Sequence, residues 1–285
     1  MRILVTGAGG QLGRDLVDIL GETHEVSGLD RDGLNITDLA RCRSAARKFL
    51  PDAVVHAAAY TAVDQAESDE EEAYRVNVTG TANMTIAARE IGAKLCYIST
   101  DYVFSGNGEA PYKEYDETGP ASVYGKTKLA GERSVQALSG RYFIVRTSWV
   151  YGRHGSNFVK TMLELAKSRP ELKVVHDQTG SPTYTADLVR FIGSLVDSEQ
   201  YGIYHASNTG ACTWYDLARA VFEEAGLPTR VIPCRTEEFP RPAPRPAYSV
   251  LDHLAIRAGG FSELRPWRDA LKEFLADWHS RASIE

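Results

Sequence analysis

The chain has 285 residues, of which 43% are hydrophobic and 25% are charged, and its formal net charge is -6. This length can bury a large core, either in one α/β unit or in a main domain with a smaller companion. The negative charge offers no general attraction to nucleic acid or to an anionic membrane surface. The chain begins directly with the apolar run Ile3-Leu4-Val5 and has no long apolar segment. We therefore expect an unprocessed cytoplasmic protein with neither a signal peptide nor a membrane span.

Four cysteines are scattered along the chain and form no Cys-x-x-Cys pair. Their spacing argues against both a zinc site and a disulfide framework, which is consistent with a reducing compartment. They are Cys42, Cys96, Cys212 and Cys234.

The first half of the sequence alternates short runs rich in β-branched residues with amphipathic stretches of helix length. This rhythm is typical of a parallel sheet with crossover helices. The predicted strands cover residues 2–5, 25–29, 53–56, 94–98 and 142–145, and the predicted helices cover 11–20, 38–49, 72–91 and 124–138. We predict an α/β fold in which residues 1–150 form a dinucleotide-binding domain of the Rossmann type, with a doubly wound parallel sheet.

The pattern loosens after residue 150 and predicts a smaller C-terminal substrate-binding lobe over residues 151–285. The chain is expected to return to the first domain around residues 183–207. Residues 239–246 contain four prolines and two arginines, which suits a loop or an extended arm. Helices are predicted at 157–167, 185–196, 214–225 and 268–278.

A glycine-rich turn follows the first predicted strand, with Gly7, Gly10 and Gly13 spaced as Gly-x-x-Gly-x-x-Gly. Such a turn lets backbone amides approach a pyrophosphate at a helix N-terminus. Glycine also favours a plain tight turn, but the position directly after the first strand favours a cofactor site. Gln11 and Leu12 complete the expected contacts of this turn.

Asp30 closes the second predicted strand, where a carboxylate can accept hydrogen bonds from an adenosine ribose. The same side chain could equally cap the turn. Arg31 follows it and could meet the extra phosphate of NADP. The two neighbours favour different coenzymes, so the choice between NADH and NADPH stays open.

Three alanines after the third predicted strand offer small side chains against which a cofactor could lie. Alanines often serve only packing, but at the carboxyl end of a strand in a nucleotide-binding fold the cofactor interpretation gains weight. The expected contacts are Ala57, Ala58, Ala59 and Tyr60.

The predicted reacting centre combines Thr100, at the end of the fourth strand, with Tyr124 and Lys128 on the helix that follows. Residues four apart share one helix face, so the ammonium can lie close to the phenol. A unit charge at about 4 Å in a dielectric of about 20 is worth about three pKa units. Most such pairs are merely solvated, but Thr100 and the glycine turn make this set a coherent site.

Longer strings resemble the extended short-chain dehydrogenase/reductase superfamily and, within it, the dTDP-4-dehydrorhamnose reductase family. The similarity spans nearly the whole chain and is least distinctive after Arg257. The strings are residues 99–104 (Ser-Thr-Asp-Tyr-Val-Phe), 124–132 (Tyr-Gly-Lys-Thr-Lys-Leu-Ala-Gly-Glu), 146–151 (Arg-Thr-Ser-Trp-Val-Tyr), 157–158 (Asn-Phe) and 177–183 (Asp-Gln-Thr-Gly-Ser-Pro-Thr).

This resemblance implies that NADH or NADPH delivers hydride to the C4 ketone of dTDP-4-dehydro-L-rhamnose, giving dTDP-L-rhamnose. Tyr124 would protonate the forming alkoxide, and Thr100 would hydrogen-bond the ketone oxygen. Lys128 would bind the nicotinamide ribose and lower the pKa of the tyrosine. General acid catalysis of this kind agrees with the residue types.

The resemblance also implies substrate contacts. Thr100 and Asp101 would face the sugar, and Trp149 would flank it. Arg245 and Asn157 would contact the diphosphate, for which a planar guanidinium is well suited. Arg241 is a weaker candidate for the same role.

Two features depart from the family pattern or extend it. Many relatives carry an acidic residue followed by an aliphatic or aromatic one where this chain has Asn35-Ile36, the expected adenine contact. Some relatives are dimers bridged by magnesium, and Asp15, Asp187 and Glu285 lie in roughly corresponding regions. Scattered acids are usually solvated, so we predict no metal site and keep Mg²⁺ as the alternative, together with a homodimer.

Other functions on the same fold are the alternatives. A nucleotide-sugar epimerase or 4,6-dehydratase would retain a tightly bound cofactor, and a regulatory subunit would bind a partner without turnover. Dehydratases place an Asp-Glu pair after the threonine, whereas here Asp101 and Tyr102 follow Thr100. The complete set of Thr100, Tyr124 and Lys128 favours catalysis over a regulatory role.

Overall fold

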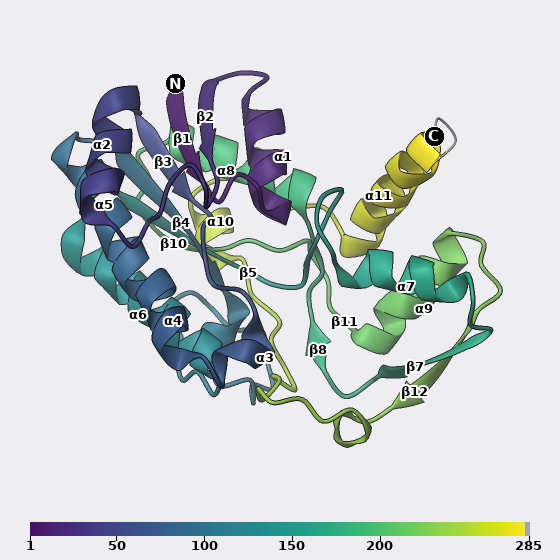
Figure 1. Cartoon of the computed structure of the whole chain (residues 1–285). Helices are drawn as coiled ribbons and strands as arrows, with labels where there is room; N and C mark the ends of the chain where they lie inside the picture. Colours follow the sequence, from purple (N-terminus) through teal and green to yellow (C-terminus); the bar gives the residue numbers. More distant parts are fainter. Residues whose placement is uncertain (283–285) are drawn as a thin grey trace.

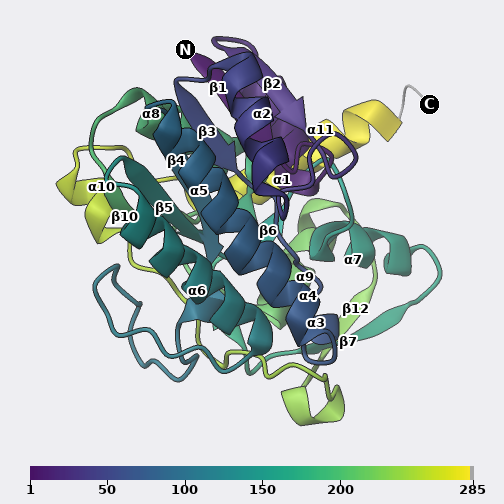
Figure 2. The same ribbon diagram turned by 60° about the vertical axis from the view of Figure 1, so that its left-hand side comes forward.

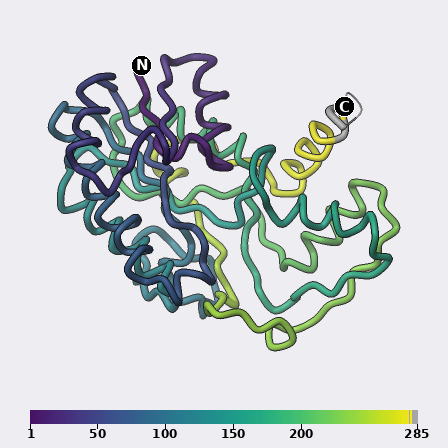
Figure 3. Tube along the Cα trace, in the orientation of Figure 1, coloured from purple at the N-terminus to yellow at the C-terminus, as the bar shows by residue number. Residues whose placement is uncertain are grey.

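The computed structural model describes residues 1–282, which form a larger and a smaller lobe side by side (Figure 1). The larger lobe holds the N-terminal half of the chain and a central sheet. The Cα trace shows that green segments, from the later part of the chain, run in both lobes (Figure 3). The two lobes are therefore joined by several passages of the chain.

The central sheet has six strands in the order β10-β5-β4-β3-β1-β2, and every neighbouring pair is parallel. The chain goes from β1 to β2 on one side and then to β3 on the other, so the strand order reverses beside β1. Open α/β sheets bind ligands at such a switch point. The predicted Rossmann-type fold is confirmed. The strands are β1 (Arg2–Thr6), β2 (Glu25–Leu29), β3 (Ala53–His56), β4 (Lys94–Thr100), β5 (Tyr142–Thr147) and β10 (Gly202–His205).

Side chains of each strand alternate between two buried faces, as strand geometry requires. Ile3 and Val5 pack with Leu188 on one face, and Leu4 packs with Met84 on the other. Figure 2 shows the helices of the second face in front of the sheet. The first face is covered by α1 (Gln11–Leu20), α8 (Thr185–Asp197) and α10 (Leu254–Ala258), and the second by α2 (Leu39–Phe49), α5 (Thr81–Glu90) and α6 (Val123–Leu138).

The single helix predicted over 72–91 is wrong in one respect, because a π-helical segment, Arg75–Gly80, separates α4 (Glu70–Tyr74) from α5. Within it, Asn77 is buried and accepts a hydrogen bond from the Tyr60 amide at 2.8 Å. The side-chain nitrogen of Asn77, Nδ2, donates a hydrogen bond to Thr127 Oγ1 at 2.9 Å. Segments of π-helix are frequent at functional sites, and this one joins the loop after β3 to α6.

The smaller lobe packs its helices around a second apolar core that includes Val159, Leu217 and Phe274. As predicted, residues 239–246 form neither helix nor strand. None of the helices formed by residues 1–282 is both long and apolar enough for a membrane crossing. The elements of this part are β6 (Val150–Tyr151), α7 (Phe158–Ala166), β7 (Glu171–Val175), β8 (Thr179–Gly180), β9 (Thr183–Tyr184), β11 (Cys212–Thr213), α9 (Trp214–Glu224), β12 (Arg230–Cys234) and α11 (Trp267–Ala282).

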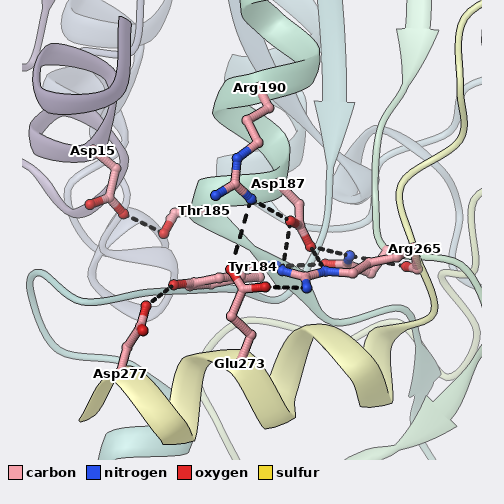
Figure 4. A network of polar contacts seen from close by, with 9 residues as sticks. Asp15, Tyr184, Thr185, Asp187, Arg190, Arg265, Glu273 and Asp277 are labelled. Carbon is pink, nitrogen blue, oxygen red and sulfur yellow. Dashed lines mark hydrogen bonds and ion pairs between the residues drawn. The ribbon is translucent and has the colours of Figure 1, made fainter. Parts of the chain in front are cut away.

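A polar network joins α8 to α11 where the two lobes meet (Figure 4). Asp187 on α8 accepts two hydrogen bonds from the Arg265 guanidinium, both at 2.9 Å, and one from Asn208 at 2.8 Å. Arg265 also pairs with Glu273 on α11. Asp187 is thus a buried carboxylate whose charge is fully engaged by the protein.

We expect Asp187→Asn to lower the free energy of unfolding by about 2 kcal/mol, because it leaves donors of Arg265 and Asn208 without a charged acceptor. Arg190→Gln is the matched control. Arg190 also pairs with Asp187, but its side chain is 58% exposed, so its loss should cost less than about 1 kcal/mol. Urea unfolding followed by circular dichroism measures both values, and equal losses would contradict this ranking.

Candidate active site

The glycine turn between β1 and α1 packs closely on itself and on the loop after β3, which requires glycine at two positions. Gly7 has a φ of +72°, and a Cβ there would lie 2.7 Å from the Ala58 nitrogen. A Cβ at Gly13 would lie 2.0 Å from the Gly7 carbonyl oxygen. The N-cap residue of α1, Gly10, provides no side-chain cap for the first helical amides. These amides suit the pyrophosphate of a dinucleotide.

The loop after β2 holds the residues expected to contact the adenosine. Asp30 Oδ1 accepts hydrogen bonds from the amides of Asp32 at 3.1 Å and Gly33 at 2.9 Å, so the carboxylate caps this turn. Ile36 is buried beneath Gly80, whose added Cβ would lie 2.6 Å from Ile36 Cδ1. Asp30 therefore performs the capping role and still borders a large cleft.

One cleft of about 2050 Å³ runs from the glycine turn to the smaller lobe. The structure brings nearly all of the sequence-predicted site residues to its walls. They are Gly7, Gly10, Gln11, Leu12, Gly13, Asp30, Arg31, Asn35, Ile36, Ala57, Ala58, Ala59, Tyr60, Thr100, Asp101, Tyr124, Lys128, Trp149, Arg241 and Arg245.

The reacting centre lies where β4 ends and α6 begins. Thr100 Oγ1 donates to Asp101 Oδ1 at 2.9 Å and accepts from the Tyr102 amide at 3.2 Å. Tyr124 is in the first turn of α6, which is capped by Ser122 Oγ accepting from the Gly125 amide at 3.1 Å. The end of β4 and the N-terminus of α6 thus bring the threonine and the tyrosine to one edge of the sheet.

Burial has the largest effect on the pKa values of the ionisable groups at this centre. It raises the pKa of the Tyr124 phenol above its usual value, and the nearby Thr100 hydroxyl opposes this only in part. Burial lowers the pKa of Lys128 to about 7, against the attraction of Glu132. The pKa of Asp101 is raised to about 6, again by burial. The expected lowering of the tyrosine pKa is therefore not what the structure shows.

The reason lies in where the lysine points. Lys128 Nζ donates to the Ile98 carbonyl at 2.6 Å and lies 4.1 Å from the centre of the Tyr97 ring. Its contacts are thus with β4, and desolvation outweighs the electrostatic benefit predicted from the spacing.

A buried ion pair that the sequence analysis missed holds α6 in place. Glu132 and Arg146 are 1% and 3% exposed, and two hydrogen bonds of 2.8 and 2.9 Å join them. Ser99 Oγ donates to the same carboxylate at 2.5 Å. Glu132 continues the spacing of Tyr124 and Lys128 by another four residues, which is the signal that could have revealed it.

Aromatic side chains form the wall of the cleft on the side of the smaller lobe. Trp149 stacks on Trp214 with ring centroids 3.5 Å apart, and Phe158 packs on the same tryptophan. Trp149 has a φ of +48°, a conformation that non-glycine residues rarely adopt. Trp214 Nε1 donates to Gln178 Oε1 at 3.1 Å. Sequence reasoning found Trp149 but neither Trp214 nor Phe158.

The structure does not bring Asn157 to the cleft. Its side chain caps α7 by accepting from the Lys160 amide at 3.0 Å and donates to Gln11 Oε1 and to the Gly152 carbonyl, both at 2.9 Å. Through these contacts, the side-chain amide of Asn157 helps to join the two lobes. Arg245 does border the cleft, paired with Asp64 at 2.9 Å.

A family model described as the RmlD substrate binding domain matches residues 1–280. The chain belongs to this family.

Relatives and solved structures agree with this membership. The RmlD-family chain is 47% identical to the spore coat polysaccharide biosynthesis protein SpsK of Bacillus subtilis, over 97% of both chains. It is 46% identical to a dTDP-4-dehydrorhamnose reductase of Mycolicibacterium smegmatis, over 96% of this chain and 85% of that one. The crystal structure of a dTDP-4-dehydrorhamnose reductase from Bacillus anthracis in complex with NADP has a TM-score of 0.95 and 44% identity, covering 97% of this chain and 99% of that one.

The acids considered for a metal in this RmlD-family chain have other partners. Asp15 accepts a hydrogen bond from Thr185, while Asp187 is held by Arg265 (Figure 4). Glu285 lies outside the described residues. Within residues 1–282, the group with metal-ligand spacing consists of Asp15, Asp18 and His154 and does not include Asp187. Among the described residues, Asp15 and Asp187 thus share no group with metal-ligand spacing, and the alternative of Mg²⁺ is not supported.

We expect Gly13→Ala to weaken NADPH binding by about tenfold or more, because the new Cβ displaces the Gly7 carbonyl and distorts the turn. Gly140→Ala is the matched control, since a Cβ at Gly140 meets nothing within 4 Å. Titration of protein fluorescence with NADPH measures both affinities. Unchanged binding by Gly13→Ala would contradict the assignment of this turn to the cofactor.

Proposed function

We propose that the chain reduces the C4 ketone of dTDP-4-dehydro-L-rhamnose to dTDP-L-rhamnose with a reduced nicotinamide coenzyme. The observation that carries this proposal is the placement of Thr100, Tyr124 and Lys128 in the same cleft as the glycine turn. The relative named dTDP-4-dehydrorhamnose reductase from Mycolicibacterium smegmatis, which matches 96% of this chain, supports the same substrate.

The coenzyme would lie along the glycine turn and the alanines that follow β3. The turn packs so closely at Gly7 and Gly13 that side chains there would collide with the backbone, and it leads into α1, whose first amides have no side-chain cap and suit the pyrophosphate. NADPH or NADH, when bound, supplies the hydride that the ketone receives. The NADP in the related Bacillus anthracis structure supports NADPH, and Arg31 at the cleft would meet its extra phosphate, whereas Asp30 favours NADH.

Tyr124 and Thr100 would hold the ketone oxygen between two hydroxyl groups. Because burial raises the pKa of Tyr124, its phenol is fully protonated at neutral pH. A protonated phenol is the form that reduction requires, since an alkoxide forming at the substrate oxygen is the stronger base and takes the proton. Lys128 would bind the nicotinamide ribose and stabilise the phenolate that remains.

The rest of the substrate would extend toward the smaller lobe. Asp101 and Trp149 border the cleft beside the reacting centre and would contact the sugar. Arg245 would contact the diphosphate through its guanidinium. We also propose a cytoplasmic location, which the four free, buried cysteines support. The homodimer stays a prediction.

We expect the purified protein to oxidise NADPH in the presence of the keto sugar made by a dTDP-glucose dehydratase and epimerase. Tyr124→Phe should lower kcat by about 10²–10⁴-fold, because it removes the proton donor. Tyr74→Phe, at an exposed tyrosine on α4, is the matched control and should keep the wild-type rate. Loss of absorbance at the reduced nicotinamide band measures turnover.

The same assay separates the alternatives. Sugar conversion without net coenzyme oxidation would identify an epimerase. No conversion of any nucleotide-linked keto sugar would contradict an enzymatic role and favour a regulatory subunit.

We expect kcat/KM for the keto sugar to fall as the pH is raised through about 7. Burial lowers the pKa of Lys128 from 10.5 to about 7, so the ammonium is complete below that pH and is lost above it. Lys128→Arg keeps its charge throughout and should lose this decline, even if it is slower. Rates between about pH 5 and pH 9 test this, and an unchanged profile in Lys128→Arg would contradict it.

A further inference from the structure

Asp64, on the short helix α3 (Val63–Ala66), holds the proline-rich arm of residues 239–246 against the larger lobe. Its carboxylate lies 2.9 Å from Arg245 Nη2 and 4.0 Å from Arg241 Nη1. The amide of Ala243 donates to Asp64 Oδ1 at 3.3 Å. One side chain thus contacts the arm at three points.

Arg245 has an unused donor beside this ion pair. Its side chain is 19% exposed, and within residues 1–282 its buried Nη1 has no hydrogen-bond partner while Nη2 pairs with Asp64. A buried donor without an acceptor is unfavourable. Both Arg245 and Asp64 border the cleft, and the exposed part of the Arg245 side chain lets a ligand with acceptor oxygens reach its guanidinium.

The geometry points to Asp64 as a positioning residue: it fixes one edge of the Arg245 guanidinium so that the other edge binds the diphosphate of the nucleotide sugar. This inference rests on the proposed function. A guanidinium is planar and rigid, so fixing one edge sets the direction of its remaining N–H groups. An arginine oriented before binding loses less side-chain entropy when the anion arrives.

The position of this arginine also matters for the reacting centre. Burial raises the pKa of the Tyr102 phenol to about 12, and the positive charge of nearby Arg245 opposes this rise. The Tyr102 ring meets that of Tyr124 edge to face, with centroids 5.5 Å apart. Glu67, three residues after Asp64, accepts from the Val123 amide at 2.9 Å, at the start of α6. One short segment therefore locates both the phosphate-binding arm and the catalytic helix.

Calorimetric titration with dTDP tests the inference directly. We expect Asp64→Asn to raise the dissociation constant for dTDP about tenfold, because the charge-assisted contact that orients Arg245 is lost. Asp64→Glu keeps the charge but moves the carboxylate by one methylene group, so it should also weaken binding. Glu71→Gln, which removes an exposed negative charge on nearby α4, is the matched control and should bind dTDP like the wild type.

A double-variant cycle shows whether Asp64 acts through Arg245. In an Arg245→Ala background, Asp64→Asn should cause no further loss of dTDP affinity. The NADPH dissociation constant, measured for every variant, should stay at the wild-type value and shows that the larger lobe remains folded.

Unchanged or tighter dTDP binding by Asp64→Asn would overturn the inference, as would wild-type affinity in Asp64→Glu or an undiminished loss in the Arg245→Ala background. Failure of the proposed function is separate and is seen in the wild type. If the wild type binds dTDP but reduces no dTDP-linked keto sugar, the reductase proposal fails while the role of Asp64 is still measured by the titrations.

Discussion

The buried ion pair between Glu132 and Arg146 is the constraint on which the reacting centre depends. It fastens α6, which carries Tyr124 and Lys128, to β5, while Ser99 adds β4 to the same carboxylate. Burying two charges is costly, and only good geometry with further hydrogen bonds offsets the desolvation. Here both oxygens of Glu132 receive nitrogen donors. The burial that makes this ion pair costly also holds it in one position. It therefore fixes the place of α6 and of the tyrosine that α6 carries.

The same depth sets the protonation states of the catalytic groups. Glu132 lies one helical turn beyond Lys128 and favours its charged form, yet burial still lowers the pKa of the lysine to about 7. For Tyr124, burial works in the opposite direction and preserves the neutral phenol. Burial thus keeps the proton on the Tyr124 phenol until the alkoxide, a stronger base, forms on the substrate. The lysine of the site, held against β4, changes charge near neutral pH.

Local patterns explain which parts of this site could be predicted from the sequence. The glycine turn, the strand end at Thr100 and the helical spacing of Tyr124 and Lys128 each depend on neighbouring residues, and periodicity places them correctly relative to the sheet. The same spacing places Glu132 on the helix face of Tyr124 and Lys128, but its pairing with Arg146 depends on how β5 and α6 pack, which spacing does not encode. Asn157 shows the converse: its residue type suits phosphate, but its amide is engaged in capping α7 and bridging to Gln11.

The π-helical segment and the proline-rich arm, in the second half of the cleft, also depend on contacts that local sequence patterns do not encode. Amphipathic periodicity predicted a continuous helix over 72–91, because a π turn changes the register by one residue and leaves the overall pattern nearly intact. The arm was predicted to be irregular, since prolines exclude ladder hydrogen bonds, but its course depends on Asp64, almost 180 residues earlier in the chain. The junction at Asp187 is buried, whereas Asp64 is 32% exposed. The lobes are therefore joined firmly beside the sheet and more loosely at the arm.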